Sequence, residues 1–72
     1  MNKNMLAAAM VAHGDNQQSL AEAMGISLSR MNAKINGSDG ADFWSNEIKF
    51  IADRYGLGAK ELYNIFFAEK VS

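Results

Sequence analysis

The sequence predicts an all-α protein, a compact five-helix domain. Apolar residues recur at the three- and four-residue spacing of helices, and no segment alternates apolar and polar residues as a strand does. Glycines and polar clusters divide the chain into short segments, each flanked by residues that favour the beginning or the end of a helix. With 72 residues the chain can build one modest core, so we expect residues 1–72 to form a single domain.

The first two helices are expected over residues 4–13 and 17–24. Asn16 is a favourable N-cap for the second helix, and Gly14 and Gly25 are suited to end the first and the second. In both segments apolar side chains share one face at helical spacing. These core candidates are Leu6, Ala9, Met10, Leu20, Ala21 and Met24.

A third helix is expected over residues 28–36. Ser27 is a good N-cap, and Gly37 is expected to end the helix. Met31 and Ile35 lie four residues apart and therefore face the core together.

After a polar loop, the last two helices are expected over residues 46–55 and 59–70. Ser45 is expected to cap the fourth helix, and Gly56 to end it. Apolar residues again recur at helical spacing in both segments. They are Ile48, Ile51, Ala52, Tyr55, Leu62, Ile65 and Phe66.

The composition excludes several classes of protein. Cysteine is absent, which excludes disulfides and thiolate metal sites. The longest apolar run, residues 5–12, is too short to span a bilayer, and a typical signal-peptide cleavage pattern is missing, so we expect a soluble cytoplasmic protein with no membrane partner. The net charge is −1, whereas most nucleic-acid-binding proteins carry a basic face.

Catalytic and metal-binding motifs are also missing from the sequence. His13 is the only histidine and has no second ligand candidate nearby, and Asp15, Asp39 and Asp42 do not fit the spacing of a calcium loop. There is no glycine-rich phosphate loop after a strand and no room for a deep pocket. We therefore expect no enzymatic activity, no cofactor, no metal and no small-molecule substrate.

The most informative stretch runs from residue 16 to residue 37. Ala21 is small, which lets the second helix approach the third closely, and Gly25 can adopt a positive φ, so the chain can turn within about three residues. Ile26 fills the corner of this turn. Ser27 caps the next helix and leaves its first turn exposed, where it can enter a DNA major groove. This pattern predicts a helix-turn-helix over about residues 17–36.

The same stretch resembles the helix-turn-helix of the lambdoid phage repressor and Cro family of transcriptional regulators. The matching positions are Gln17 at the start of the second helix, Leu20-Ala21, Gly25-Ile26-Ser27 and Asn36-Gly37. The second half of the chain is similar to small phage-type members of the family, through residues 43–55, Leu57 and residues 61–67. The resemblance implies a phage repressor-like DNA-binding fold and sequence-specific binding of double-stranded DNA by a regulator or repressor of phage or prophage type.

Two positions depart from the family pattern. Ser38-Asp39 stand where the family often has a cation, and Leu28 occupies a first reading position that is often polar. With the near-neutral charge, the apolar Leu28 favours a second interpretation, in which the chain is a protein-binding adaptor that does not bind DNA. A polar, mildly positive surface on the third helix would favour DNA, and an acidic or continuous apolar one would favour a protein partner.

If the chain binds DNA, the outer face of the third helix is expected to read bases. Asn32 can pair with adenine, Ser29 can donate or accept a hydrogen bond, and Ala33 can touch a thymine methyl group. Leu28 either reads a thymine methyl group or is a partly buried residue at the turn. The alternative for the whole set is an ordinary solvated polar face.

Phosphate contacts are expected from residues at the helix ends and from cations. Gln17 either donates to a phosphate or is an ordinary solvated helix residue, and Asn36 either reaches a phosphate or only caps the third helix. Arg30 and Lys34 are either phosphate ligands or solvated cations. The candidates together are Asn16, Gln17, Ser27, Arg30, Lys34 and Asn36. Arg30 and Lys34, with or without Lys3, would neutralise about four to six phosphates in a dimer, which predicts a slope of about −4 to −5 for log affinity against log salt.

The last helix carries more apolar surface than one small core can cover. We therefore expect a homodimer through Tyr63, Phe66 and Phe67 that binds a palindromic operator, with two recognition helices about 34 Å apart. The alternative is that Phe67 folds back onto the first helix. Phe43 and Trp44 precede the fourth helix, where a core or staple role is more consistent than a base-stacking platform.

Overall fold

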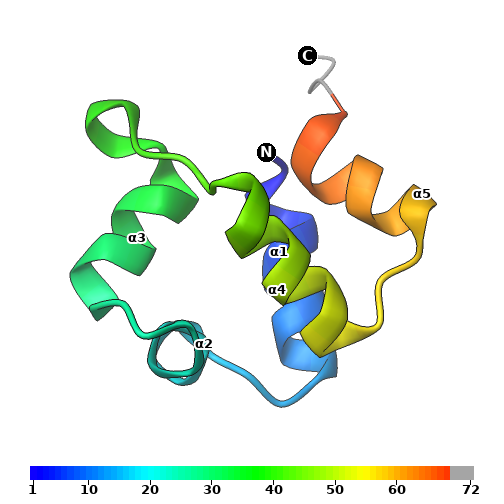
Figure 1. Ribbon diagram of the computed structural model, residues 1–72, viewed down its shortest axis with the longest axis horizontal. Helices are drawn as coiled ribbons and strands as arrows, with labels where there is room; N and C mark the ends of the chain where they lie inside the picture. The colour runs from blue at the N-terminus through cyan, green and yellow to red at the C-terminus, as the bar shows by residue number, and fades with distance from the viewer. Residues whose placement is uncertain (69–72) are drawn as a thin grey trace.

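The computed structural model describes residues 1–68 of the chain, and these residues form an all-helical domain (Figure 1). The helices are α1 (Lys3–Ala12), α2 (Gln17–Met24), α3 (Leu28–Asn36), α4 (Ser45–Tyr55) and α5 (Ala59–Leu62). A short 3-10 turn, η1 (Ser38–Gly40), follows α3, and a π-helical segment, η2 (Tyr63–Phe67), continues α5. The prediction of a five-helix, all-α domain is confirmed.

Helices α2 and α3 have the predicted bounds, and α1 is displaced by one residue. The expected cap of α4 is wrong: the helix begins at Ser45, and Trp44 is its N-cap. The reason is that the Glu47 carboxylate accepts the backbone N–H of Trp44 at 2.8 Å, so the first turn is closed by a glutamate instead of the serine hydroxyl.

The last helix differs from the expectation of one α-helix over residues 59–70. The α-helical part ends at Leu62, and residues 63–67 form a π turn that is closed by a 2.7 Å bond from Ala68 N–H to the carbonyl of Tyr63. Residues 69 and 70 lie outside the described part of the chain. The N-terminal segment is fixed against this turn, because Asn2 N–H donates to the Ile65 carbonyl at 2.7 Å.

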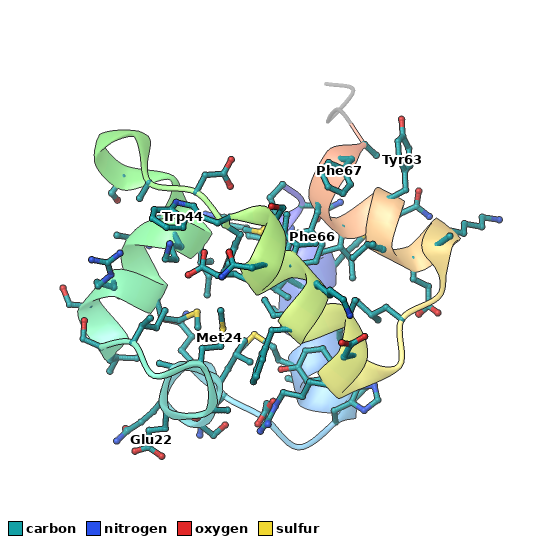
Figure 2. The ribbon with its side chains drawn as sticks, viewed as in Figure 1. Glu22, Met24, Trp44, Tyr63, Phe66 and Phe67 are labelled. Atoms are coloured by element: carbon teal, nitrogen blue, oxygen red, sulfur yellow. The ribbon has the colours of Figure 1, made fainter. Side chains whose placement is uncertain are left out.

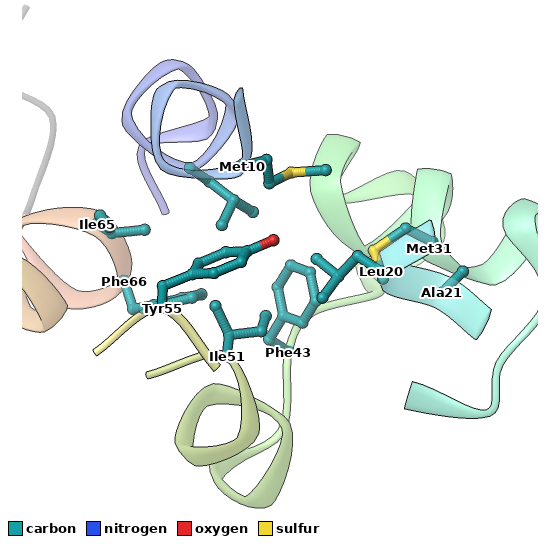
Figure 3. Close-up of a cluster of buried hydrophobic side chains, with 10 residues drawn as sticks. Met10, Leu20, Ala21, Met31, Phe43, Ile51, Tyr55, Ile65 and Phe66 are labelled. Carbon is teal, nitrogen blue, oxygen red and sulfur yellow. The ribbon is translucent and has the colours of Figure 1, made fainter. Parts of the chain in front are cut away.

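The core lies where α1, α2, α3, α4 and η2 meet (Figure 3). Leu6, Leu20, Met31 and Ile51 are the largest fully buried side chains. The remaining buried apolar residues are Met10, Ala21, Phe43, Tyr55, Ile65 and Phe66. The inward faces expected from helical spacing are therefore confirmed for every helix of the sequence prediction.

Asp15 connects the α1–α2 loop to the end of α4. Its carboxylate accepts hydrogen bonds from Tyr55 Oη at 2.6 Å, Arg54 Nε at 2.7 Å and Ser19 Oγ at 2.8 Å, and its side chain is only 6% exposed. Bonds from Arg54 and Tyr55 hold the pKa of the Asp15 carboxyl well below its usual range. Burial and the neighbouring carboxylate raise the pKa of Tyr55 well above its usual range. The charged form of Asp15 therefore stabilises the entry into α2.

Replacing Asp15 by Asn is expected to lower the free energy of unfolding by about 1.5 kcal/mol near pH 7, because hydrogen bonds to a charged group are lost. Since folding depresses this pKa, the contribution is present above the unfolded value of about 4 and is lost as pH falls below it. Urea denaturation across that range should show acid destabilisation in the wild type that the variant lacks. Asp53→Asn, which breaks an exposed 3.0 Å pair with Lys49, is the control and should change the free energy of unfolding little. Equal effects of the two variants would contradict this role of Asp15.

Candidate nucleic-acid interface

Local capping builds the turn between α2 and α3. Asn16 Oδ1 accepts the backbone N–H of Ser19 at 2.8 Å, and Ser19 Oγ accepts the N–H of Asn16 at 2.9 Å, so the first turn of α2 is closed on both sides. Gly25 ends α2 with φ at 74°, a left-handed conformation that favours glycine. Ala21 is buried, and its carbonyl accepts the N–H of Ile26 at 3.0 Å. Three residues are therefore sufficient to join the helices.

Ser27 begins α3 and leaves its first turn open to solvent. Its hydroxyl accepts the backbone N–H of Arg30 at 3.1 Å. Leu28, directly after the cap, is 47% exposed. Leu28 was expected either to contact a thymine methyl group or to be partly buried at the turn. Its exposure favours the first of these roles.

The outer face of α3 is polar and exposed. Ser29, Asn32 and Asn36 are exposed, while Met31 on the opposite side is fully buried. Ala33 is half-buried on the flank of this face. Asn36 Nδ2 donates to Asn32 Oδ1 at 2.9 Å, so two of the predicted contact residues form a pair one helical turn apart.

Lys34 lies inside the protein instead of on this face. Its side chain is 5% exposed, and its Nζ lies 3.0 Å from Glu47 Oε1 and 3.1 Å from the carbonyl of Asp42. The same ammonium lies 5.4 Å from the ring centroid of Trp44. Its charge is therefore neutralised within the fold by Glu47, although its side chain lines the same groove as Arg30.

Arg30 and Trp44 border a groove on the flank of α3. The groove has a volume of about 390 Å³ and is lined by Arg30, Ala33, Lys34, Ser38, Gly40, Ala41, Asp42 and Trp44. Arg30 is exposed there. The expectation for the two aromatic residues before α4 is confirmed for Phe43, which is buried, and is wrong for Trp44, which is 65% exposed (Figure 2).

Gln17 and Asn16 lie at a second groove, between α1 and the start of α2. This groove has a volume of about 250 Å³ and an apolar floor that includes Leu6, Met10 and Ile35. Gln17 is half-buried at its edge, and Lys3 also borders it. The first turn of α2 therefore presents the amide side chains of Gln17 and Gln18, while the Asn16 side chain is used in the cap.

The predicted dimer residues divide into two groups. Phe66 is 8% exposed and packs edge-to-face on Phe43 with ring centroids 5.9 Å apart, so the core already uses it and its assignment to a subunit interface is corrected. Tyr63 and Phe67 are 57% and 56% exposed, on the side of the molecule away from α3 (Figure 2). This exposure is not consistent with Phe67 folding back onto α1.

The polar cluster of Asp15, Arg54 and Tyr55, which ties the α1–α2 loop to α4, has no local signal in the sequence. His13 stacks on Tyr55, with ring centroids 4.9 Å apart. Within residues 1–68, no group of three or more His, Asp or Glu side chains is placed to hold a metal ion. In that same part of the chain, no helix has the length and apolar character required to cross a membrane.

In comparison with known proteins, no family model, no curated protein and no solved structure matches this chain.

Proposed function

We propose that this chain binds double-stranded DNA in a sequence-specific manner, with α3 in the major groove. The observation that carries the proposal is the exposed polar face of α3, which is formed by Ser29, Asn32 and Asn36. The three-residue connection from α2 leaves the beginning of this helix open to solvent. The resemblance to phage repressors suggests that the biological role is transcriptional regulation, and repression in particular.

The side chains of α3 suit the edges of base pairs. Asn32 offers both a donor and an acceptor, the combination that matches adenine in the major groove. Ser29 can donate or accept, and Leu28 and Ala33 can contact thymine methyl groups. These four residues are the proposed base contacts.

Few charged side chains are available for the proposed phosphate contacts. Arg30 is exposed beside the reading face, and Gln17 and Asn36 carry amide donors at the start of α2 and the end of α3. Asn16 and Ser27 contribute through the helix starts that they cap, where backbone N–H groups favour anions. Lys34 is not a proposed phosphate contact, because its ammonium is paired with Glu47.

The salt dependence of DNA binding should therefore be shallower than the charge count of the sequence suggests. With Arg30 and Lys3 as the interface cations, a dimer would neutralise about four phosphates, which gives a slope of about −3.5 for log affinity against log salt. Titration of a bound duplex over a salt series measures this slope. A slope steeper than about −8 would mean that other cations contact the phosphates.

We further propose a homodimer on a palindromic site, formed through Tyr63 and Phe67. Both side chains are exposed on the side away from α3, so this interface would leave α3 of each copy free, and a palindromic site requires the two recognition helices to lie about 34 Å apart. Phe67→Ser should convert a dimer to a monomer in light scattering, with and without DNA. Val11→Ser, at a side chain that is 77% exposed on α1, is the control and should leave the mass unchanged; a wild type that is monomeric even on DNA would contradict this proposal.

An adaptor that binds another protein is the second candidate function. Leu28 and Trp44 are large exposed apolar side chains on or beside α3, and Lys34 adds no free charge there. The two functions differ in one measurement, because the adaptor should not bind any duplex even at about 50 mM salt.

A further inference from the structure

Asn32 and Asn36 form a hydrogen-bonded amide pair on the exposed face of α3. Asn36 Nδ2 donates to Asn32 Oδ1 at 2.9 Å. An asparagine amide has two donor hydrogens on nitrogen and two acceptor sites on oxygen. The bond therefore couples the two amides: while Asn36 turns its nitrogen toward Asn32, Asn32 turns its oxygen toward Asn36, which leaves one acceptor site and both donor hydrogens of Asn32 available.

The backbone holds Asn36 in the position from which it makes this bond. Asn36 is the last residue of α3, and Gly37 follows it with φ at 67°. The N–H of Gly37 donates to the carbonyl of Ala33, which closes the final turn. The Asn36 side chain is thereby kept one helical turn from Asn32, on the same face.

We propose that Asn36 is a positioning residue that sets which base Asn32 reads; this inference rests on the proposed DNA binding. Recognition of adenine requires an acceptor toward N6 and a donor toward N7 at the same time. If the Asn32 amide rotates by half a turn, its donor and acceptor exchange places and no longer match adenine. In the orientation that the structure shows, the oxygen of Asn32 needs a donor at position 36, and the Asn36 amide supplies it.

The proposal predicts that the chemistry at position 36 changes the base preference. An alanine removes the donor and leaves both orientations of Asn32 accessible. A glutamine keeps an amide donor within reach of the residue one turn earlier. An aspartate only accepts, so Asn32 has to turn its nitrogen toward position 36 and present its oxygen to the groove, where it suits the N4 donor of cytosine.

The experiment measures the affinity of each protein for one selected duplex and for its three variants at a single base pair. That base pair is the one at which Asn32→Ala removes discrimination. Asn36→Ala should reduce the preference for adenine there about twofold, the factor expected when two orientations become equally accessible, while the ranking at all other positions is retained. Asn36→Gln should restore the preference, and Asn36→Asp should shift it from adenine to cytosine.

Asn4→Asp is the matched control, because it adds the same negative charge on α1 and should not change the base preference. Circular dichroism verifies that each variant is folded, and Asn36→Gln keeps the test decisive if the alanine variant is not. An Asn36→Ala protein that binds all four duplexes more weakly by one common factor, or with unchanged discrimination, would overturn the positioning role and leave DNA binding intact. If the wild type and every variant fail to bind any duplex, the proposed function itself fails.

Discussion

Replacing Glu47 by Ala is expected to lower the free energy of unfolding by about 3–5 kcal/mol, which is a large part of the stability of so small a domain. The Glu47 carboxylate lies 3.0 Å from Nζ of Lys34, whose side chain is 5% exposed. Its removal leaves the buried ammonium without a carboxylate partner from α4, beside the Asp42 carbonyl and the Trp44 ring. It also removes the acceptor for the backbone N–H of Trp44, the N-cap of α4.

The matched variant Lys34→Met should lower the free energy of unfolding less than Glu47→Ala does. Methionine fills a similar volume without a charge, and the remaining Glu47 carboxylate, 14% exposed, keeps its bond from the Trp44 N–H. Urea denaturation followed by circular dichroism gives the two free energies. A Glu47→Ala variant as stable as the wild type would show that this ion pair does not hold α3 against α4.

Replacing Asn32 by Ala is expected to reduce discrimination for the preferred base pair by about 1–3 kcal/mol, the range of a bidentate contact. Competition between the selected duplex and single-base-pair variants measures this loss. Gln17→Ala is the comparison, because loss of a phosphate contact should weaken binding to all sequences alike. If Asn32→Ala leaves the ranking of duplexes unchanged, α3 does not read bases through this face.

The fold around the turn could be predicted because its signals are local. Asn16, Gly25 and Ser27 act on backbone groups within three or four residues, so their positions in the sequence were sufficient to fix the bounds of α2 and α3. The core faces followed from helical spacing for the same reason. The π turn at residues 63–67 had no such signal, since it accompanies a contact between Ile65 and the distant Asn2.

The charges of the site could not be assigned from the sequence, because their partners are distant in the chain. Lys34 pairs with Glu47 thirteen residues away, and Asp15 binds Arg54 thirty-nine residues away. One signal for Lys34 was present: it follows Met31 by three residues and therefore lies on the buried side of α3. Its neutralisation leaves Arg30 as the cation beside the reading face, which makes the proposed recognition depend on neutral donors.

Sequence selection from a random pool of duplexes, followed by titration of the selected and of unselected duplexes, tests the central claim most directly. DNA binding through α3 predicts one enriched motif, and a clear preference for it over unselected DNA that Asn32→Ala reduces. Because few cations are proposed to contact phosphates, binding to unselected DNA is expected to be weak. No enrichment, together with no binding to any duplex at about 50 mM salt, would contradict DNA binding and favour the adaptor function.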